Sequence, residues 1–306
     1  MDGDQMIAHH AGGIPLHNSP LHNTAGPSRS TQSSGRKIAT LIALVAGFSA
    51  AFVLAPGMLT SRPGDGYAGE GELVETVRAA FVEYWSSGVQ AFSPSLESAV
   101  DYWLRYHVAK AVIAVILLTV LLALGRMVKA SFVNAGPLTT GKKLAFVSAG
   151  GLVTLLALFS SVLVMANVQG VVAPFSSLIS MLPVAQTDGA LSETVGQVRQ
   201  QLAQSTATGN QQSPALELMI SDFARYHLAM AVIALIAAAI SLAVTAVVWA
   251  RFARTARSDR RTRFMSGSIG LLTALFTLGL IVVGVANMGT AADPAPALAA
   301  FFDGGL

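Results

Sequence analysis

The sequence predicts an all-α integral membrane protein with five transmembrane helices and a small extracytoplasmic helical cap. Composition, five long apolar segments and a repeated motif support this fold class. Of the 306 residues, 53% are hydrophobic and only 11% are charged, whereas about a quarter of a soluble domain is charged. Cysteine is absent, which excludes disulfides, thiolate nucleophiles and cysteine metal sites.

Five apolar segments are close to the length of about 20 residues that an α-helix needs to cross a bilayer. Several of them are rich in Ala and Gly, which allows close helix packing in a membrane. They run approximately over Ile38–Met58, Val108–Gly125, Leu144–Val168, Leu228–Ala250 and Ile269–Met288.

The basic residues predict the orientation of these spans. Thirteen Lys and Arg lie in the N-terminal tail and in the turns after the second and fourth segments, and five lie in the other connections. Short cytoplasmic loops carry the excess of Lys and Arg. We therefore expect a cell (plasma) membrane protein with a cytoplasmic N-terminus, an extracytoplasmic C-terminus and the lipid bilayer as its first partner.

The motif R-Y-H-x-A-x-A-V-I-A occurs twice, at Arg105–Ala114 and Arg225–Ala234. Further matches recur in the same order at offsets of 118 to 120 residues, which indicates a tandem repeat of two and a half copies. Each full copy crosses the membrane twice, so the copies are parallel and inverted repeats are excluded. The matched pairs include Leu73 with Leu191, Ser93-Pro94 with Ser213-Pro214, Pro56 with Pro174 and Pro294, and Ala166-Asn167 with Ala286-Asn287.

These boundaries divide the chain into four parts. The polar tail 1–36 has the composition of a disordered cytoplasmic segment. Repeat units follow at 37–142 and 143–263, and each consists of an outward span, an external helical loop and a long helix that returns inward. A half repeat, 264–306, ends in an external C-terminal tail.

Each external loop is predicted to contain an amphipathic helix. Apolar side chains recur there every three or four residues, which is typical of one helix face. Ser93 and Ser213, each followed by Pro, are good N-caps for the long helices. The expected apolar faces comprise Leu73, Val77, Phe81, Tyr84 and Trp85 in the first copy, and Leu191, Val195, Val198 and Leu202 in the second.

Polar residues at the outer ends of the spans are the candidate ligand-binding site. Lys110 is the sharpest of them, because an ionisable residue inside a membrane is a functional hypothesis and its counterpart is Met230. The structural alternative is that Tyr and Arg anchor at the interface, with Asp101 and Asp222 as local ion-pair partners. The full set is Arg105, Tyr106, His107, Lys110, Asn167, Arg225, Tyr226, His227 and Asn287.

The sequence favours a non-enzymatic scaffold or accessory subunit whose aromatic-bearing cap meets a membrane or extracytoplasmic protein. The first alternative is binding or transport of a small ligand or lipid at the polar site. The least favoured is an enzyme using the paired histidines, since we find no nucleophile motif. We expect no catalytic residue, metal, cofactor or nucleic acid, and the oligomeric state stays open. The arginine-rich turn Arg251–Arg263 fixes topology or binds anionic lipid.

Overall fold

The computed structural model describes residues 29–60, 67, 69–135, 137–185, 189–208 and 212–304. Within these ranges all regular secondary structure is helical. The helices are α1 (Arg29–Thr60), α2 (Glu70–Ser87), α3 (Pro94–Asn134), α4 (Thr140–Val172), α5 (Pro174–Ile179), α6 (Gly189–Thr208), α7 (Pro214–Arg254), α8 (Arg260–Ala292) and α9 (Pro294–Phe302).

Five of these helices, α1, α3, α4, α7 and α8, are long and apolar enough to span a membrane, as the sequence predicted. The second span was expected to end near Gly125, but α3 continues to Asn134. One glycine inside a helix costs only about 1 kcal/mol. A Cβ at Gly125 would lie 3.4 Å from the Val153 side chain of α4, so the glycine serves close helix packing.

The start of the chain differs from the prediction in one respect. Helix α1 begins at Arg29, so the last part of the predicted disordered tail is helical, whereas residues 1–28 lie outside the described part of the structure. By internal contacts the chain forms two compact units, 1–37 and 38–306, and the packing described below belongs to the second.

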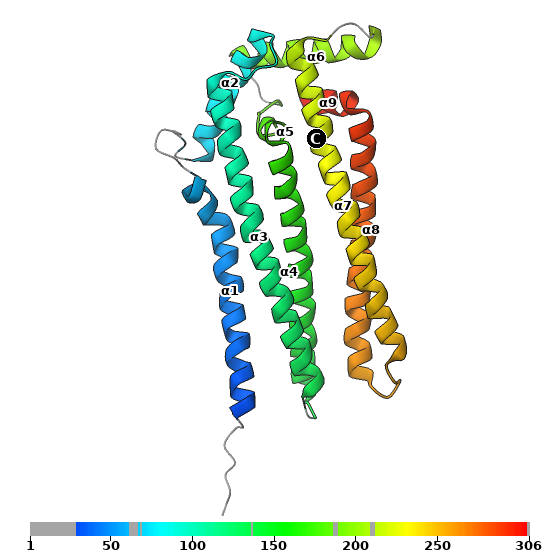
Figure 1. Cartoon of the computed structure of the whole chain (residues 1–306). Coiled ribbons are helices and arrows are strands. Elements are labelled where there is room, and N and C mark those ends of the chain that lie inside the picture. Colours follow the sequence, from blue (N-terminus) through cyan, green and yellow to red (C-terminus); the bar gives the residue numbers. More distant parts are fainter. Residues whose placement is uncertain are drawn as a thin grey trace, which may run out of the picture. The chain divides into compact units, whose positions relative to one another are not determined.

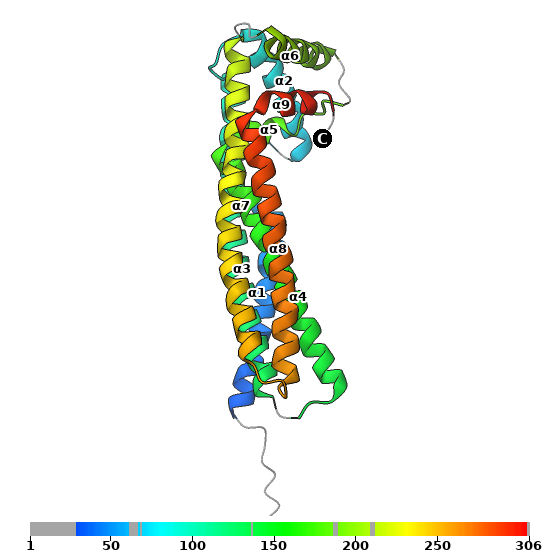
Figure 2. The same ribbon diagram turned by 90° about the vertical axis from the view of Figure 1, so that its right-hand side faces the viewer.

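Within the second unit, α3 packs along α4 and α7 packs along α8, while α4 also contacts α7 and α8. Figures 1 and 2 show these long helices side by side. Small residues allow the close approach: a Cβ at Gly284 of α8 would lie 2.9 Å from the Leu235 side chain of α7. Many large apolar side chains on the five long helices remain exposed, which suits contact with lipid.

One end of the second unit holds a separate cluster of helices (Figure 1). Helices α2, α5, α6 and α9 and the first turns of α3 and α7 share one apolar core; we call them the end cluster. The residues expected to form the two amphipathic faces are buried there. Ser93 and Ser213 cap α3 and α7 by accepting hydrogen bonds from the backbone N–H groups of Leu96 and Leu216, which confirms both predicted N-caps.

The prolines that match in the sequence take different places in the helices, and the C-terminal segment is more ordered than expected. Pro174 and Pro294 each begin a short helix directly after a span, but Pro56, their match in the sequence, lies inside α1. The C-terminal segment was expected to be an external tail. Its described part forms α9 instead, because Leu298 and Phe302 are fully buried in the end cluster.

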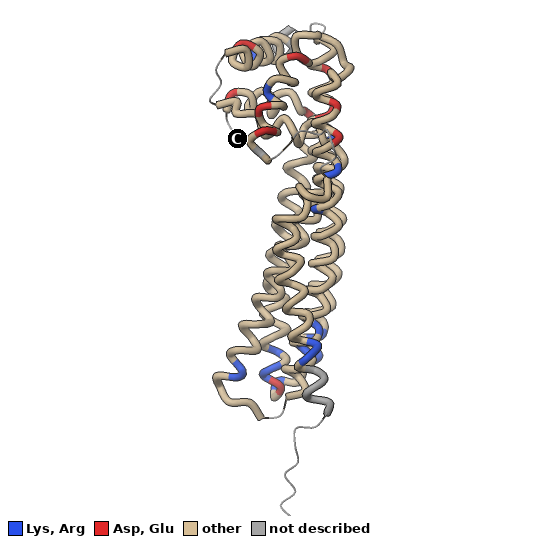
Figure 3. The backbone as a smooth tube through the Cα atoms, turned by 90° about the vertical axis from the view of Figure 1, so that its left-hand side faces the viewer, with Lys and Arg blue, Asp and Glu red and all other residues tan. Residues whose placement is uncertain are grey.

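Charged residues are separated along the second unit (Figure 3). Asp and Glu are concentrated in the end cluster, where a few Arg also lie, and most of the other Lys and Arg lie at the α3–α4 and α7–α8 turns at the opposite end. The stretch between them is almost free of charge. This pattern is the one that spans inside a bilayer require.

Tyr84 links α2 to α7 inside the end cluster. Its side chain is fully buried, and its hydroxyl donates a hydrogen bond of 3.1 Å to the carbonyl of Ala215. Burial raises the pKa of Tyr84 to about 12, with a further contribution from the negative charge of Asp222. The folded protein therefore holds this proton more tightly than the unfolded chain, where a tyrosine pKa is about 10.

Replacing Tyr84 with Phe is expected to lower the free energy of unfolding by about 1 kcal/mol, because a buried hydrogen bond is lost. The difference from wild type should be full below pH ~10 and shrink as pH rises from ~10 toward ~12, since only the unfolded chain ionises there. Thermal unfolding in detergent between pH 8 and 11 measures it.

Tyr102→Phe is the matched control, since Tyr102 is also buried but its ring contacts are aromatic, with Tyr67 and Tyr106. A Tyr84→Phe protein as stable as wild type at every pH would show that the hydrogen bond contributes nothing to the end cluster.

Candidate functional site

The first R-Y-H motif lies on α3, where that helix leaves the end cluster. Helix α4 runs alongside and ends at Val172, and α5 begins two residues later at Pro174. This abrupt change brings α5 against α3. His107 on α3 is thereby enclosed by Asn167 of α4 and Ser177 of α5.

A continuous chain of hydrogen bonds passes through His107. Trp103 Nε1 lies 3.0 Å from Ser177 Oγ, and Ser177 Oγ lies 3.1 Å from His107 Nε2. On the other side of the ring, His107 Nδ1 lies 3.0 Å from Asn167 Oδ1. Asn167 Nδ2 completes the chain by donating to the carbonyl of Leu163 at 2.7 Å.

The donors and acceptors in this chain agree with one another. Because the Asn167 amide nitrogen donates to a carbonyl, its oxygen is the acceptor, so His107 Nδ1 carries a hydrogen. The Trp103 indole N–H can only donate, which leaves the Ser177 hydroxyl hydrogen for His107 Nε2. A neutral His107 thus satisfies every link of this chain.

The order hydroxyl, imidazole and third polar side chain is similar to that of a serine-activating triad, although such triads use a carboxylate where Asn167 stands here. Here the Ser177 side chain is buried, with only 6% of its surface exposed, and its oxygen already accepts from Trp103. In this conformation the hydrogen bonds hold α3, α4 and α5 together, and they do not present the Ser177 hydroxyl as a reactive group.

Gly170 makes the close contact between α4 and His107 feasible. A Cβ at this position would lie 2.6 Å from His107 Cδ2, far inside van der Waals contact. The imidazole cannot simply turn away, because both of its nitrogens are engaged. Only glycine fits without breaking the chain.

The second R-Y-H motif also forms a hydrogen bond between a histidine and an asparagine, here between α7 and α8; we call each such pair a His–Asn clamp. His227 Nδ1 lies 2.8 Å from Asn287 Oδ1, and Asn287 Nδ2 donates to the carbonyl of Val283 at 2.9 Å. An aromatic ring also lies against each histidine, from Trp103 at 4.8 Å and from Phe223 at 4.5 Å. The His–Asn clamp is therefore common to both helix pairs.

The other hydrogen bonds around His107 have no counterpart in the second copy, 120 residues later. The polar or small residues that complete the first site are replaced by residues that cannot make the same contacts. At the matched positions Trp103, Lys110, Gln169, Gly170 and Ser177 become Phe223, Met230, Gly289, Thr290 and Ala297.

Two further sets of hydrogen bonds join the first site to α7. Gln169 Nε2 donates to the carbonyl of Tyr226 at 3.1 Å. The buried Asp222 carboxylate accepts from the backbone N–H and the hydroxyl of Ser176, at 2.9 and 2.8 Å. Its other oxygen lies 3.3 Å from Arg225. The predicted local ion pair is confirmed, and Asp222 also holds α5.

The predicted pair of Asp101 with Arg105 is present as well, at 3.8 Å. Lys110 is a residue of α3, and its side chain extends toward α1. Its ammonium lies 4.7 Å from the Phe52 ring centroid and 5.1 Å from that of Tyr106. Both distances suit cation–π attraction. This contact accounts for a cation on an apolar helix without assigning it a ligand.

The structure thus arranges the predicted residues as two His–Asn clamps joined through Gln169, with Lys110 beside the first. Sequence reasoning missed the residues that complete the first site, Trp103, Ser177, Gln169 and Gly170. A comparison of the two copies could have found them, because each differs from the residue 120 positions later. In the sequence analysis this comparison was applied only to Lys110. Within the described residues, no group of three or more His, Cys, Asp or Glu side chains could hold a metal ion.

Gly170→Ala is expected to destabilise the protein by about 1–3 kcal/mol, the usual cost of overpacking, because the new methyl group displaces His107. Gly151→Ala on the same helix is the control: a Cβ there meets nothing within 4 Å, and alanine favours a helix. Thermal unfolding of both variants in detergent measures the effect. Equal stabilities for the two variants would contradict the assigned packing of His107.

No family model, curated protein or solved structure matches the chain. Its function must therefore be argued from the residues and geometry of its own sites.

Proposed function

We propose that this chain is a multipass protein of the plasma membrane that acts as a non-enzymatic scaffold or accessory subunit. In this proposal the end cluster is its extracytoplasmic cap and meets a partner of basic character. One observation carries the proposal: His107, Asn167 and Ser177 of the candidate site direct their polar atoms at other protein atoms, while most described carboxylates of the end cluster remain exposed.

The hydrogen-bonded His107 site supports a structural role. Catalysis or ligand recognition uses donors and acceptors directed at the bound molecule. Both ring nitrogens of His107, the amide of Asn167 and the hydroxyl of Ser177 are instead directed at protein atoms. The second copy keeps the His–Asn clamp without the other polar groups, as expected for a structural element.

The surface of the end cluster supports recognition through charge. Phe81, Tyr84 and Trp85, which made the cap aromatic in sequence, are buried and stabilise its core. Most described Asp and Glu residues of the end cluster are exposed instead, although Arg78 and Arg199 pair with Glu75 and Asp303 there. A surface with an excess of carboxylates attracts a basic partner and raises its association rate. The exposed acids include Glu72, Glu75, Glu83, Glu97, Asp101, Glu193, Glu217, Asp293 and Asp303.

The helix bounds support the tandem repeat of two and a half copies. Helices α3 and α7 are both 41 residues long and α4 and α8 are both 33, and each pair begins 120 residues apart. Helices α5 and α9 follow at the same offset. The repeat units proposed at 37–142 and 143–263, with the half repeat 264–306, have their boundaries in the first turns of α4 and α8.

The positive turns support the proposed orientation. Both the α3–α4 turn and the α7–α8 turn carry several Lys or Arg, and such turns stay in the cytoplasm. The end cluster would then be extracytoplasmic and lie just outside the bilayer. The lipid bilayer and one membrane or extracytoplasmic protein are the partners that this arrangement implies.

A second candidate function is binding of a small ligand or lipid, or chemistry, at the His107 site. The observation favouring it is that Trp103, Lys110, Gln169, Gly170 and Ser177 are special to the first copy. A site that diverges from its repeat toward more polar groups is what a function added to one copy would produce. The Ser177–His107–Asn167 order names the group to test.

The scaffold proposal predicts a charge-dependent contact at the end cluster. A photo-crosslinking residue placed at the exposed Ser98 should give one discrete protein adduct in native membranes, and the same residue at Ile240, a lipid-facing position, should not. Glu97→Gln with Glu193→Gln, or high salt, should weaken the adduct several-fold because the attraction is electrostatic. Adducts equal at both positions, or insensitive to charge, would contradict the proposal.

The proposal also predicts that Ser177 is unreactive. A fluorophosphonate probe added to membranes containing the full chain should leave the protein unlabelled, since the Ser177 hydroxyl is buried and bonded on both sides. Fluorescence after gel separation and mass spectrometry of the peptide measure labelling. Labelling that disappears in Ser177→Ala but persists in Ser176→Ala would instead establish the second candidate.

A further inference from the structure

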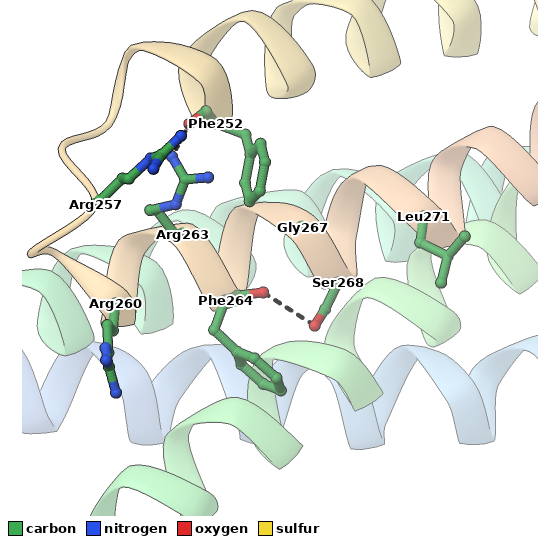
Figure 4. Close-up of a pocket in the computed structure, with 8 residues that line it drawn as sticks. All are labelled: Phe252, Arg257, Arg260, Arg263, Phe264, Gly267, Ser268 and Leu271. Carbon is green, nitrogen blue, oxygen red and sulfur yellow. Dashed lines mark hydrogen bonds between the residues drawn. The ribbon is translucent and has the colours of Figure 1, made fainter.

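A pocket of about 460 Å³ lies at the end of the α7–α8 pair farthest from the end cluster. Figure 4 shows its lining along the start of α8 and the facing end of α7. Three of the lining residues are arginines, Arg257, Arg260 and Arg263. The remainder includes Phe252, Phe264 and Leu271, so the pocket combines positive charge with apolar surface.

The arginines of this region divide into two groups. Arg257, Arg260 and Arg263 line the pocket. Arg261 points elsewhere: it donates to the carbonyl of Ala135 at 3.2 Å and lies 5.8 Å from the Phe132 ring. Arg251 and Arg254 lie in the last turn of α7 and outside the lining. A requirement for positive charge in a cytoplasmic turn alone does not distinguish these positions.

One lining arginine is held in place by the protein. Arg263 Nη1 donates to the carbonyls of Phe252 and Thr255, at 3.1 and 2.9 Å, and its guanidinium lies 4.2 Å from the Phe252 ring centroid. The neighbouring carboxylate, Asp259, is engaged at the start of α8, where it accepts from the backbone N–H of Thr262 at 3.1 Å. Arg257 and Arg260 are exposed; in Figure 4, Arg257 lies near Arg263, whereas Arg260 extends to the other side of α8.

The apolar wall runs from the arginines along α8. Phe264 and Leu271 have 61% and 56% of their surface exposed, and Leu271 lies two turns further along the helix. Between them lies Gly267, which also lines the pocket; a Cβ there would lie 3.4 Å from the Phe252 ring. A molecule with an anionic group at one end and a hydrocarbon chain at the other would contact both parts at once.

We propose that this pocket binds the phosphate of an anionic phospholipid, with an acyl chain lying along Phe264, Gly267 and Leu271. Arginine guanidinium groups match phosphate oxygens in geometry and charge. Basic pockets at helix ends near the membrane surface bind such headgroups. Free phosphate shares the headgroup chemistry but leaves the apolar wall unused, and this inference does not depend on the role of the end cluster.

The test uses the full chain in detergent and native mass spectrometry with phosphatidylglycerol or phosphatidylcholine of identical acyl chains. The wild-type protein should retain phosphatidylglycerol in clear preference to phosphatidylcholine. Arg257→Gln with Arg260→Gln should weaken its binding by roughly 25-fold, since each arginine at an anionic membrane surface contributes about fivefold. Arg251→Gln with Arg254→Gln removes the same charge from the neighbouring turn and should change binding little.

Two further arms separate the remaining outcomes. Gly267→Leu, which fills the pocket and keeps every arginine, should also lower the preference for phosphatidylglycerol. Millimolar inorganic phosphate should fail to displace the lipid. Equal losses in the two double variants would show a general charge effect, full displacement by phosphate would show a phosphate site without a lipid, and equal retention of both lipids would show no headgroup recognition. Each of these results overturns the proposal.

Discussion

The His–Asn hydrogen bond between each long helix and the span that follows it is the interaction on which the rest of the structure depends. Inside a bilayer, lipid is as apolar as the helix surfaces, so helices associate through close packing and interhelical hydrogen bonds. His107 with Asn167, and His227 with Asn287, provide that bond near the same end of both helix pairs. The short helices α5 and α9 start a few residues beyond these asparagines, so the clamps also position the end cluster.

The two ends of the second unit carry different chemistry, and the uncharged spans keep them apart. The end cluster has a closed aromatic core and a surface of carboxylates, which suits recognition of a basic partner without a cavity. The opposite end presents arginines beside apolar side chains, which suits the headgroup and chain of a lipid. Between them, the first clamp has acquired polar neighbours that the second lacks, and these neighbours tie α3, α4 and α5 together.

Apolar length was enough to predict the five spans, and the Ser-Pro pairs were enough to predict the N-caps Ser93 and Ser213. Both features depend only on residues close together in the chain. The His107 site could be predicted only in part. Ser177 is 70 residues from His107 in the sequence. It reaches His107 because helix α4 ends before Ala173 and α5 then packs on α3. Pro56 shows the limit of local rules, since the residue type that begins α5 and α9 lies here within α1, which continues to Thr60.

The orientation that we propose places the acidic end cluster outside the cytoplasm and the arginine-lined turn inside it. Because the chain has no cysteine, single-cysteine variants Glu193→Cys and Ser258→Cys, both at exposed positions, can be treated in intact cells with a membrane-impermeant maleimide. The account predicts labelling of Glu193→Cys in intact cells and labelling of Ser258→Cys only after the membrane is opened. The reverse pattern, or labelling of both in intact cells, would contradict it.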